Sequence, residues 1–383
     1  MRMQQPGRPT RIARLAVPLA LAIAIAPIAL VAATRDAPPA VQVSTLPERL
    51  SSAEFWKLVT DISEPGGYFR IVDNFTSNER EVGQLFTMLR ERGTQGGVYL
   101  GVGPEQNLTY IAAIRPEMAF IVDIRRQAVM QHLMFKAIFE LSKDRADFLA
   151  LLFTKPRPPG IDTSTGIQQI WDAYWPVATS DTAAWAANHA RLVEHLTRAH
   201  GFTFTDEEAT QLRLVYRAFY NYGPVISTRG SPGGRGPGNG TTFADLTGYS
   251  YDASGQPRSF LSSEENYRFV KGLHEKNLIV PVSGDFGGPK AIRAIGAWLK
   301  ERGGVVSAFY VSNVEQYLFQ DRKDHAFYEN VATLPVNESS VFIRPYSLRR
   351  GAIVESLCPI AAFLVPARVG QVYSNSDALA CVR

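Results

Sequence analysis

The sequence predicts an α/β fold in three layers, with a mostly parallel sheet and a mainly helical insertion at about 155–262. Two observations lead to this expectation. Short apolar runs typical of strands are followed by a polar, glycine-containing turn and then by a helical pattern, at 98–123 and again at 278–300. The 383 residues are 45% hydrophobic, which is enough to bury a large core.

The first strand–turn–helix unit, VYLGVGPEQNLTYIAAIRPEMAFIVDIRR, carries the clearest functional pattern. Its first strand ends in a turn that contains Gly101 and Gly103, and Pro104 suits the first turn of the helix that follows. A second apolar strand ends at Asp123, 22 residues after Gly101. This spacing fits a nucleoside site, in which the glycines let the backbone approach the ligand and the carboxylate accepts ribose hydroxyls.

A structural interpretation of the same unit stays open. The pattern also fits an ordinary βαβ turn with a buried aspartate at the end of its second strand. Glu105 stands near the start of the helix, where its charge would repel a phosphate group. We therefore expect a ligand without phosphates at this turn.

The 98–123 segment resembles the first two motifs of class I S-adenosylmethionine-dependent methyltransferases. The resemblance implies a Rossmann-like fold and S-adenosylmethionine as cofactor, with Gly101 and Gly103 on its methionine part and Asp123 on its ribose. That family usually has an acid two residues before the first glycine, whereas this chain has Tyr99.

A longer resemblance covers about 55–363. This region is similar to a family of uncharacterised bacterial proteins that carry the blocks GVYLGVGPEQN, FIVDIRR, GDFGGPKAIRAIG and FYVSNVEQYLF, all present here. It implies a fold but no reaction.

The segment before this unit is predicted to contain a helix at 53–62, a strand at 68–72 and a helix at 82–92. The polar residues 73–79 lie between the last two. They form either a substrate loop, with Asn78 as the binding residue, or a simple helix cap.

Helical patterns follow Asp123 at 125–142 and 146–153, and in the insertion at 167–175, 182–200 and 206–219. His132 and Lys136 lie one turn apart on the first of these helices. They face either the pocket or solvent. The glycine-rich stretch 230–240 predicts a loop.

The second strand–turn–helix unit begins with the continuous apolar run 278–282, typical of a buried parallel strand. Asp285 follows this strand, and ligands of open α/β sheets bind at the carboxyl ends of strands. Asp285 is therefore the best candidate for a reacting or substrate-holding carboxylate. Alternatively, it caps the helix that starts after Pro289.

A further strand at 305–311 places Asn313 and Glu315 at the same edge. We expect Asp285 and Asn313 as catalytic residues, and Asn78 and Glu315 as substrate-binding residues, around one cleft. Strands at 341–344 and 361–365 complete the sheet, with an antiparallel strand at its edge.

The N-terminal residues 1–34 are typical of a secretory signal peptide or a single membrane anchor. Four arginines precede an uncharged apolar run at 15–34. A linker at 35–52 and the α/β domain at 53–383 follow. We expect an exported protein that is periplasmic or anchored in the inner membrane, and that contacts the membrane only if the segment is uncleaved.

Net charge gives no reason to expect a nucleic-acid partner. Removing residues 1–33 lowers the 40 Lys and Arg to 36, which balances the 36 Asp and Glu. The expected partner is a small molecule.

The two cysteines and six histidines limit the other chemistries. Cys358 and Cys381 either pair in an oxidising compartment or stay unpaired. The histidines are scattered without a metal-binding spacing, so we expect no metal site.

Three functional hypotheses follow. The first is methyl transfer, which depends on aligning two bound groups and needs no nucleophile–base pair. The second is a non-catalytic binding or structural protein on a degenerate methyltransferase scaffold. The third is hydrolysis that uses Asp285 and Glu315 as a carboxylate pair.

Overall fold

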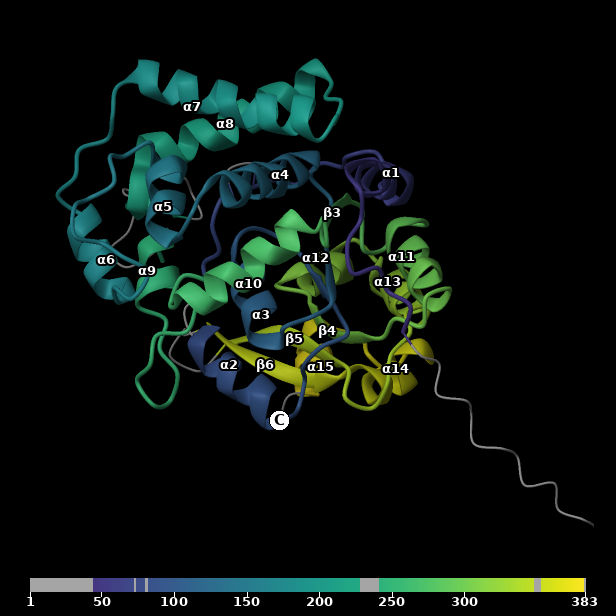
Figure 1. Cartoon of the computed structure of the whole chain (residues 1–383). Helices are drawn as coiled ribbons and strands as arrows, with labels where there is room; N and C mark the ends of the chain where they lie inside the picture. Colours follow the sequence, from purple (N-terminus) through teal and green to yellow (C-terminus); the bar gives the residue numbers. More distant parts are fainter. Residues whose placement is uncertain (1–43, 72–73, 80–81, 228–240, 348–352, 382–383) are drawn as a thin grey trace, which may run out of the picture. The chain divides into compact units, whose positions relative to one another are not determined.

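The structure is a computed structural model that describes residues 44–71, 74–79, 82–227, 241–347 and 353–381 (Figure 1). The strands formed by these residues make one six-stranded sheet in the order β3-β2-β1-β4-β5-β6. Neighbouring strands are parallel from β3 to β5, and β6 pairs with β5 in the antiparallel direction. The chain therefore has a mixed α/β fold with a mostly parallel sheet.

The strands are short and apolar, and their side chains are buried from β1 through β4. Their bounds are β1 (Val98–Gly101), β2 (Met118–Asp123), β3 (Ile279–Ser283), β4 (Val306–Tyr310), β5 (Val341–Ser347) and β6 (Ile353–Pro359). Burial on both faces accounts for their continuous apolar runs, because helices cover each side of a parallel sheet.

Helices connect the strands. Before β3 they are α1 (Ser52–Ile62), α2 (Val82–Glu91), α3 (Gln106–Ile114), α4 (Arg126–Leu141), α5 (Arg145–Phe153), α6 (Ile167–Tyr174), α7 (Thr182–Glu194), the π-helical turn η1 (His195–Ala199), α8 (Asp206–Tyr222), the 3-10 turn η2 (Gly223–Val225), α9 (Phe243–Gly248) and α10 (Glu264–Glu275). After β3 they are α11 (Ala291–Lys300), α12 (Val314–Gln320), α13 (Asp324–Val331), α14 (Ile360–Arg368) and α15 (Asn375–Ala380).

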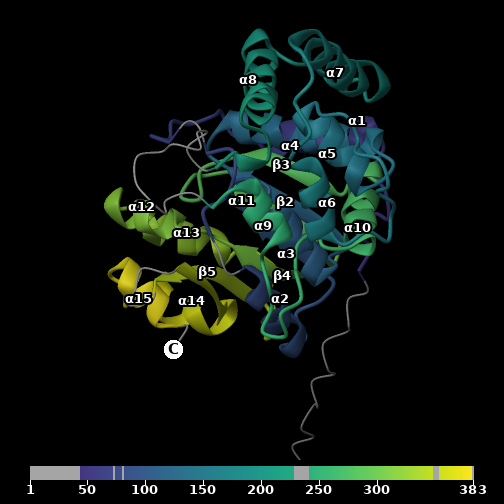
Figure 2. The same ribbon diagram turned by 90° about the vertical axis from the view of Figure 1, so that its left-hand side faces the viewer.

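Two groups of helices pack along the sheet. In one group α2 contacts α3, α3 contacts α10, and α10 contacts α4, which lies on β2 and β3. In the other, α1 contacts α11, α11 contacts α13, and α13 contacts α14. Helices α7 and α8 pack on α4, far from α14 in both views (Figures 1 and 2).

Both predicted strand–turn–helix units are confirmed. The first is β1–α3–β2, and the second is β3–α11. The four strands followed by polar turns are neighbours in the sheet, so their carboxyl ends meet at one edge.

Two predicted strands are wrong. Residues 361–365 belong to α14, and the antiparallel edge strand is β6. Phe363 and Leu364 are buried but Val365 is 72% exposed, as expected for one face of a helix. Residues 68–71 form no strand, and Tyr68 is 83% exposed. A short apolar run alone does not distinguish these cases.

The region 155–262 contains α6, α7, α8 and α9, and its described residues form only isolated bridges rather than strands. The apolar run at 15–34 and the glycine-rich stretch 230–240 lie outside the described residues. No helix in the part of the chain that the structure describes is long and apolar enough to cross a membrane.

A disulfide bond joins the end of the sheet to the C-terminal helix. Cys358 of β6 pairs with Cys381, which follows α15. Of the two alternatives for these cysteines, paired or unpaired, the structure thus shows the pair.

Candidate functional site

A cavity of about 410 Å³ opens where the parallel strands end. Gly103 lines it from the turn after β1, Asp123 from the end of β2, Asp285 from the turn after β3, and Asn313 from the turn after β4. The order of strands reverses between β1 and β4, and ligands of open α/β sheets bind at such a reversal. The cavity therefore occupies the place where this architecture binds ligands.

Most of the candidate residues come together as predicted. Gly103, Asp123, Asp285, Asn313 and Asn78 all line this cavity, although they are spread over more than 230 residues of sequence. Their catalytic and binding roles remain predictions.

Gly101 does not line the cavity. A Cβ atom at this position would lie 1.9 Å from Oδ1 of Asn107 and 2.7 Å from the hydroxyl oxygen of Tyr99. Gly101 is thus explained by close packing under the turn, and its predicted contact with a cofactor has no support in this geometry.

Glu315 does not face the cavity either, so this expectation is wrong. Its carboxylate accepts hydrogen bonds from Nε of Arg344 at 2.7 Å and from the Tyr328 hydroxyl at 2.9 Å. Both charged side chains are almost completely buried. Glu315 is the first-turn acid of α12, and its side chain ties that helix to β5.

Asn107, which the sequence pattern did not single out, holds the glycine turn in place through hydrogen bonds. Nδ2 of Asn107 donates to the carbonyl oxygens of Val102 (3.0 Å), Gly103 (3.2 Å) and Pro104 (2.7 Å). The Tyr99 hydroxyl donates to Oδ1 of the same asparagine at 2.8 Å. The turn is therefore fixed by side-chain bonds.

His132 also contacts this turn, although it faces neither the open cavity nor solvent. It is buried, and its Nε2 donates to the Gly103 carbonyl oxygen at 2.8 Å. Burial lowers the pKa of His132, so the ring is neutral at pH 7. Lys136, one turn further along, is buried as well.

Asp123 is bound by the residue two positions after it. Its Oδ1 accepts from the backbone N–H of Arg125 at 2.9 Å and from its Nε at 3.1 Å. Its Oδ2 accepts from NH2 of the same arginine at 2.9 Å. Because each carboxylate oxygen has two lone pairs, one acceptor position remains, at Oδ2.

Asp285 is also engaged. Its carboxylate accepts from the backbone N–H of Gly287 at 3.0 Å and from Nζ of Lys323 at 2.6 Å. Hydrogen bonding to Asp285 raises the pKa of Lys323. The ion pair is partly exposed, since the lysine side chain is 47% accessible.

Asp285 does not cap α11, because Glu64 does. Oε1 of Glu64 accepts from the backbone N–H groups of Lys290 at 2.9 Å and Ala291 at 2.8 Å. An acid at a helix N-terminus is favourable, but Glu64 lies more than 220 residues away in sequence, so no local pattern indicated it.

One wall of the cavity is aromatic. The ring of Phe69 packs edge-on against that of Tyr317, with centroids 5.1 Å apart, and the guanidinium of Arg70 lies 5.0 Å from the same tyrosine ring. Residues 68–71, which were predicted to lie in a strand, thus line the cavity instead. Flat faces beside a cation suit a planar ligand.

Two buried acids lie behind the lining. Glu79 accepts from the hydroxyl of Tyr310 at 2.6 Å and from that of Ser312 at 3.1 Å. Burial raises the pKa of Glu105 to about 8. Glu105 is thus mostly protonated at pH 7 and does not line the cavity, so the argument that its charge excludes phosphate is wrong.

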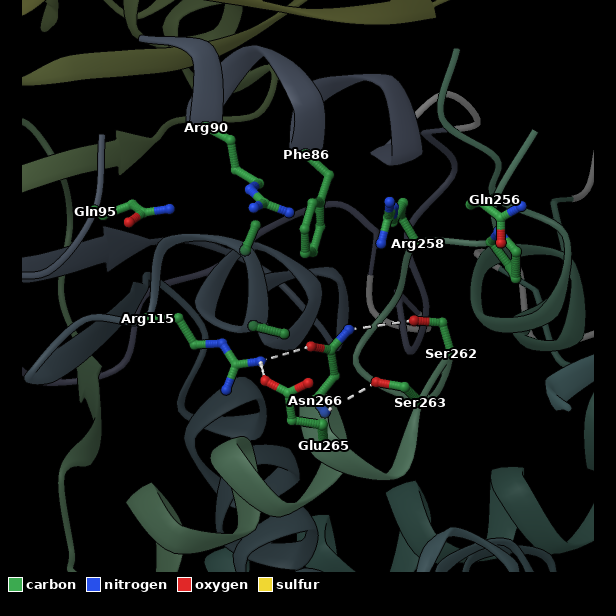
Figure 3. A pocket seen from close by; sticks show the side chains of 13 residues that line it. Phe86, Arg90, Gln95, Arg115, Gln256, Arg258, Ser262, Ser263, Glu265 and Asn266 are labelled. Carbon is green, nitrogen blue, oxygen red and sulfur yellow. Dashed lines mark hydrogen bonds and ion pairs between the residues drawn. The ribbon is translucent and has the colours of Figure 1, made fainter. Parts of the chain in front are cut away.

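Two other hollows lie elsewhere, both between α2 and the loop before α10, and one of them also reaches α3. In the one of about 460 Å³, Arg115 donates to Glu265 and Asn266, and Asn266 bonds to Ser262 and Ser263 (Figure 3). These polar groups therefore form hydrogen bonds with one another. The strand-end cavity is the better candidate site, because it lies at the reversal of strand order, where ligands of such sheets bind.

Comparisons with known proteins identify a family but no activity. The search of curated proteins finds no match. A family model described as a domain of unknown function, DUF7790, matches residues 74–211 and 246–360, more than half of the chain. Both matched segments contribute to the strand-end cavity. The chain belongs to the DUF7790 family.

Proposed function

We propose that this protein binds a small molecule with a nucleoside group in the strand-end cavity, on a three-layer, Rossmann-like scaffold of the methyltransferase type. The observation that carries the proposal is the position of the cavity at the reversal of strand order between β1 and β4. The strand order is the one found in dinucleotide-binding folds, although β6 runs antiparallel here.

The lining supports a ligand with hydroxyls and a flat ring. The free acceptor position on Asp123 takes one hydroxyl group, and Phe69 and Tyr317 offer ring faces. A ribose that uses both of its hydroxyls requires Arg125 to give up one of its bonds to Asp123. With its bonds to Arg125 intact, Asp123 therefore accepts a hydrogen bond from one ligand hydroxyl rather than from two.

S-adenosylmethionine-dependent methyl transfer is the reaction that we propose to test first. Asp123 and Gly103 would bind the cofactor. Asp285 and Asn313, across the cavity, would orient the group that receives the methyl. Such a transfer relies on alignment of the two reactants and requires no covalent intermediate on the protein.

A non-catalytic binding protein is the second candidate, and two observations favour it. Tyr99, where the methyltransferases carry an acid, has its hydroxyl committed to Asn107. The disulfide between Cys358 and Cys381, together with the arginine-flanked apolar N-terminal run, supports export. S-adenosylmethionine is a cytosolic metabolite and is not normally present outside the cytoplasm.

Isothermal titration of the full-length protein in mild detergent tests the proposal. The ligands are S-adenosylmethionine, S-adenosylhomocysteine and adenosine. We expect at least one of these ligands to bind with micromolar affinity. The affinity should fall at least tenfold in Asp123→Asn and stay unchanged in Glu265→Gln, because Glu265 lines the separate hollow of about 460 Å³. Binding of adenosine alone supports the non-catalytic candidate. Absence of binding by folded protein contradicts the nucleoside proposal.

A further inference from the structure

Three side chains of metal-binding type converge on the side of α4 that faces the helical insertion. Nε2 of His195 lies 2.7 Å from Oε2 of Glu140, and Nε2 of His200 lies 2.8 Å from the same oxygen. The three ligand atoms lie within 4.8 Å of one another. The sequence predicted no metal site, because 55 residues separate Glu140 from the nearer histidine.

The local backbone explains why both histidines point to one place. In an α-helix, residues five apart differ in direction by about 140°. Here α7 continues into one π-helical turn, in which the His200 N–H donates to the His195 carbonyl oxygen at 3.2 Å. A hydrogen bond between residues five apart brings them onto the same face, and such turns often occur at functional sites.

We propose that Glu140, His195 and His200 bind a divalent transition-metal ion. Two imidazole nitrogens and one carboxylate oxygen form a donor set that suits Zn²⁺ and its neighbours in the series. The His195 side chain is 21% exposed, so an ion can enter from solvent and keep one position for water. The ion would tie the turn after α7 to α4.

Neighbouring groups already orient the ligands. Oγ of Ser52, the first residue of α1, lies 2.8 Å from Nδ1 of His200. A serine hydroxyl both donates and accepts, so His200 can carry its proton on Nδ1 and present the lone pair of Nε2 to a metal.

The carboxylate is oriented in the same way. Nζ of Lys136 donates to Oε1 of Glu140 at 2.6 Å, which leaves Oε2 for the ion and favours binding through one oxygen. The charge of Lys136 opposes a second cation nearby, so we expect micromolar rather than much tighter affinity.

The test uses tag-free, full-length protein in mild detergent, stripped with a chelator and titrated with Zn²⁺ in a calorimeter. We expect one ion per chain, a higher melting temperature with Zn²⁺, and visible absorption of four-coordinate Co²⁺ on substitution. Affinity should fall at least tenfold in Glu140→Gln and in His195→Gln. The exposed His325 supplies the control variant His325→Gln, which should bind as the wild type does.

Several outcomes overturn the proposal. One is the absence of saturable, one-to-one Zn²⁺ binding by the wild type, which would leave the three groups as a hydrogen-bonded cluster only. Unchanged affinity in folded His195→Gln is another. Glu140→Gln removes the charge partner of buried Lys136 and risks unfolding. His195→Gln decides in that case, because its side chain is partly exposed.

Discussion

Replacing Glu105 by glutamine should remove a large part of the pH dependence of folding. The Glu105 side chain is buried next to the glycine turn, and its Oε1 accepts a long hydrogen bond, 3.3 Å, from the N–H of Ser77. Its Oε2 has no partner among the described atoms. Burial therefore raises its pKa to about 8, from 4.5 in an exposed carboxyl group.

The size of the effect follows from this difference. The folded protein keeps the proton up to about pH 8, whereas the unfolded chain loses it near pH 4.5. The associated stability is complete below pH 4.5 and is lost as the pH rises through 8. Each pH unit in this interval removes about 1.4 kcal/mol, or roughly 4 kcal/mol between pH 5 and 8. Glutamine resembles the protonated acid and avoids this loss.

Urea unfolding followed by tryptophan fluorescence at pH 5, 6.5 and 8 measures the effect. The quantity to compare is the free energy of unfolding of Glu105→Gln minus that of the wild type, because contributions of other groups cancel. This difference should grow by several kcal/mol with rising pH. Glu265→Gln, which removes an exposed carboxylate, is the control. A difference for Glu105→Gln that stays constant within about 1 kcal/mol over this range refutes the reasoning.

Two further predictions concern stability. Glu315→Ala leaves the buried side chain of Arg344 without its ion-pair partner and should lower the free energy of unfolding by about 3–5 kcal/mol. The control, Asp61→Ala, breaks an exposed ion pair and should lower it by at most about 1 kcal/mol. Equal urea midpoints for the two variants would contradict this prediction. Replacing Cys358 and Cys381 by serine opens a loop with a sequence separation of 23 and should lower stability by about 3 kcal/mol. Thiol titration of denatured, unreduced wild type should find no reactive thiol, and two thiols would exclude the bond.

Local sequence patterns predicted the strand–turn–helix units well. The helix after Gly103 and the strand that ends at Asp123 each lie in one short segment, where apolar spacing and turn residues agree. The same reasoning failed at 361–365, which belongs to a run of six apolar residues, 360–365, that starts a helix, and at 68–71, where aromatic residues line a cavity. In both cases contacts with distant elements accompany the observed conformation, namely the packing of α14 on α13 and of Phe69 on Tyr317, and a local pattern does not contain that information.

The candidate site was predicted in position but not in its bonding. Parallel strands bring their ends together whatever their side chains do, so Asp123 and Asp285 were placed correctly. The partners of these acids, Arg125 and Lys323, depend on side-chain directions. The cap that Glu64 places on α11 depends on a contact between distant segments. The meeting of His195 and His200 required an irregular helical turn that spacing rules for regular helices do not include.

The asparagine beneath the glycine turn has a consequence for how a ligand would associate. Nδ2 of Asn107 donates to three successive carbonyl oxygens, and these bonds hold the turn in place without a ligand. Little conformational entropy is then lost there on association. The aromatic wall is held by weaker contacts, since Arg70 contacts Tyr317 through a 3.4 Å hydrogen bond and by lying 5.0 Å from its ring, and Phe69 contacts the same ring edge-on. Adaptation to different ligands should therefore occur on the aromatic wall, while the turn acts as a rigid template.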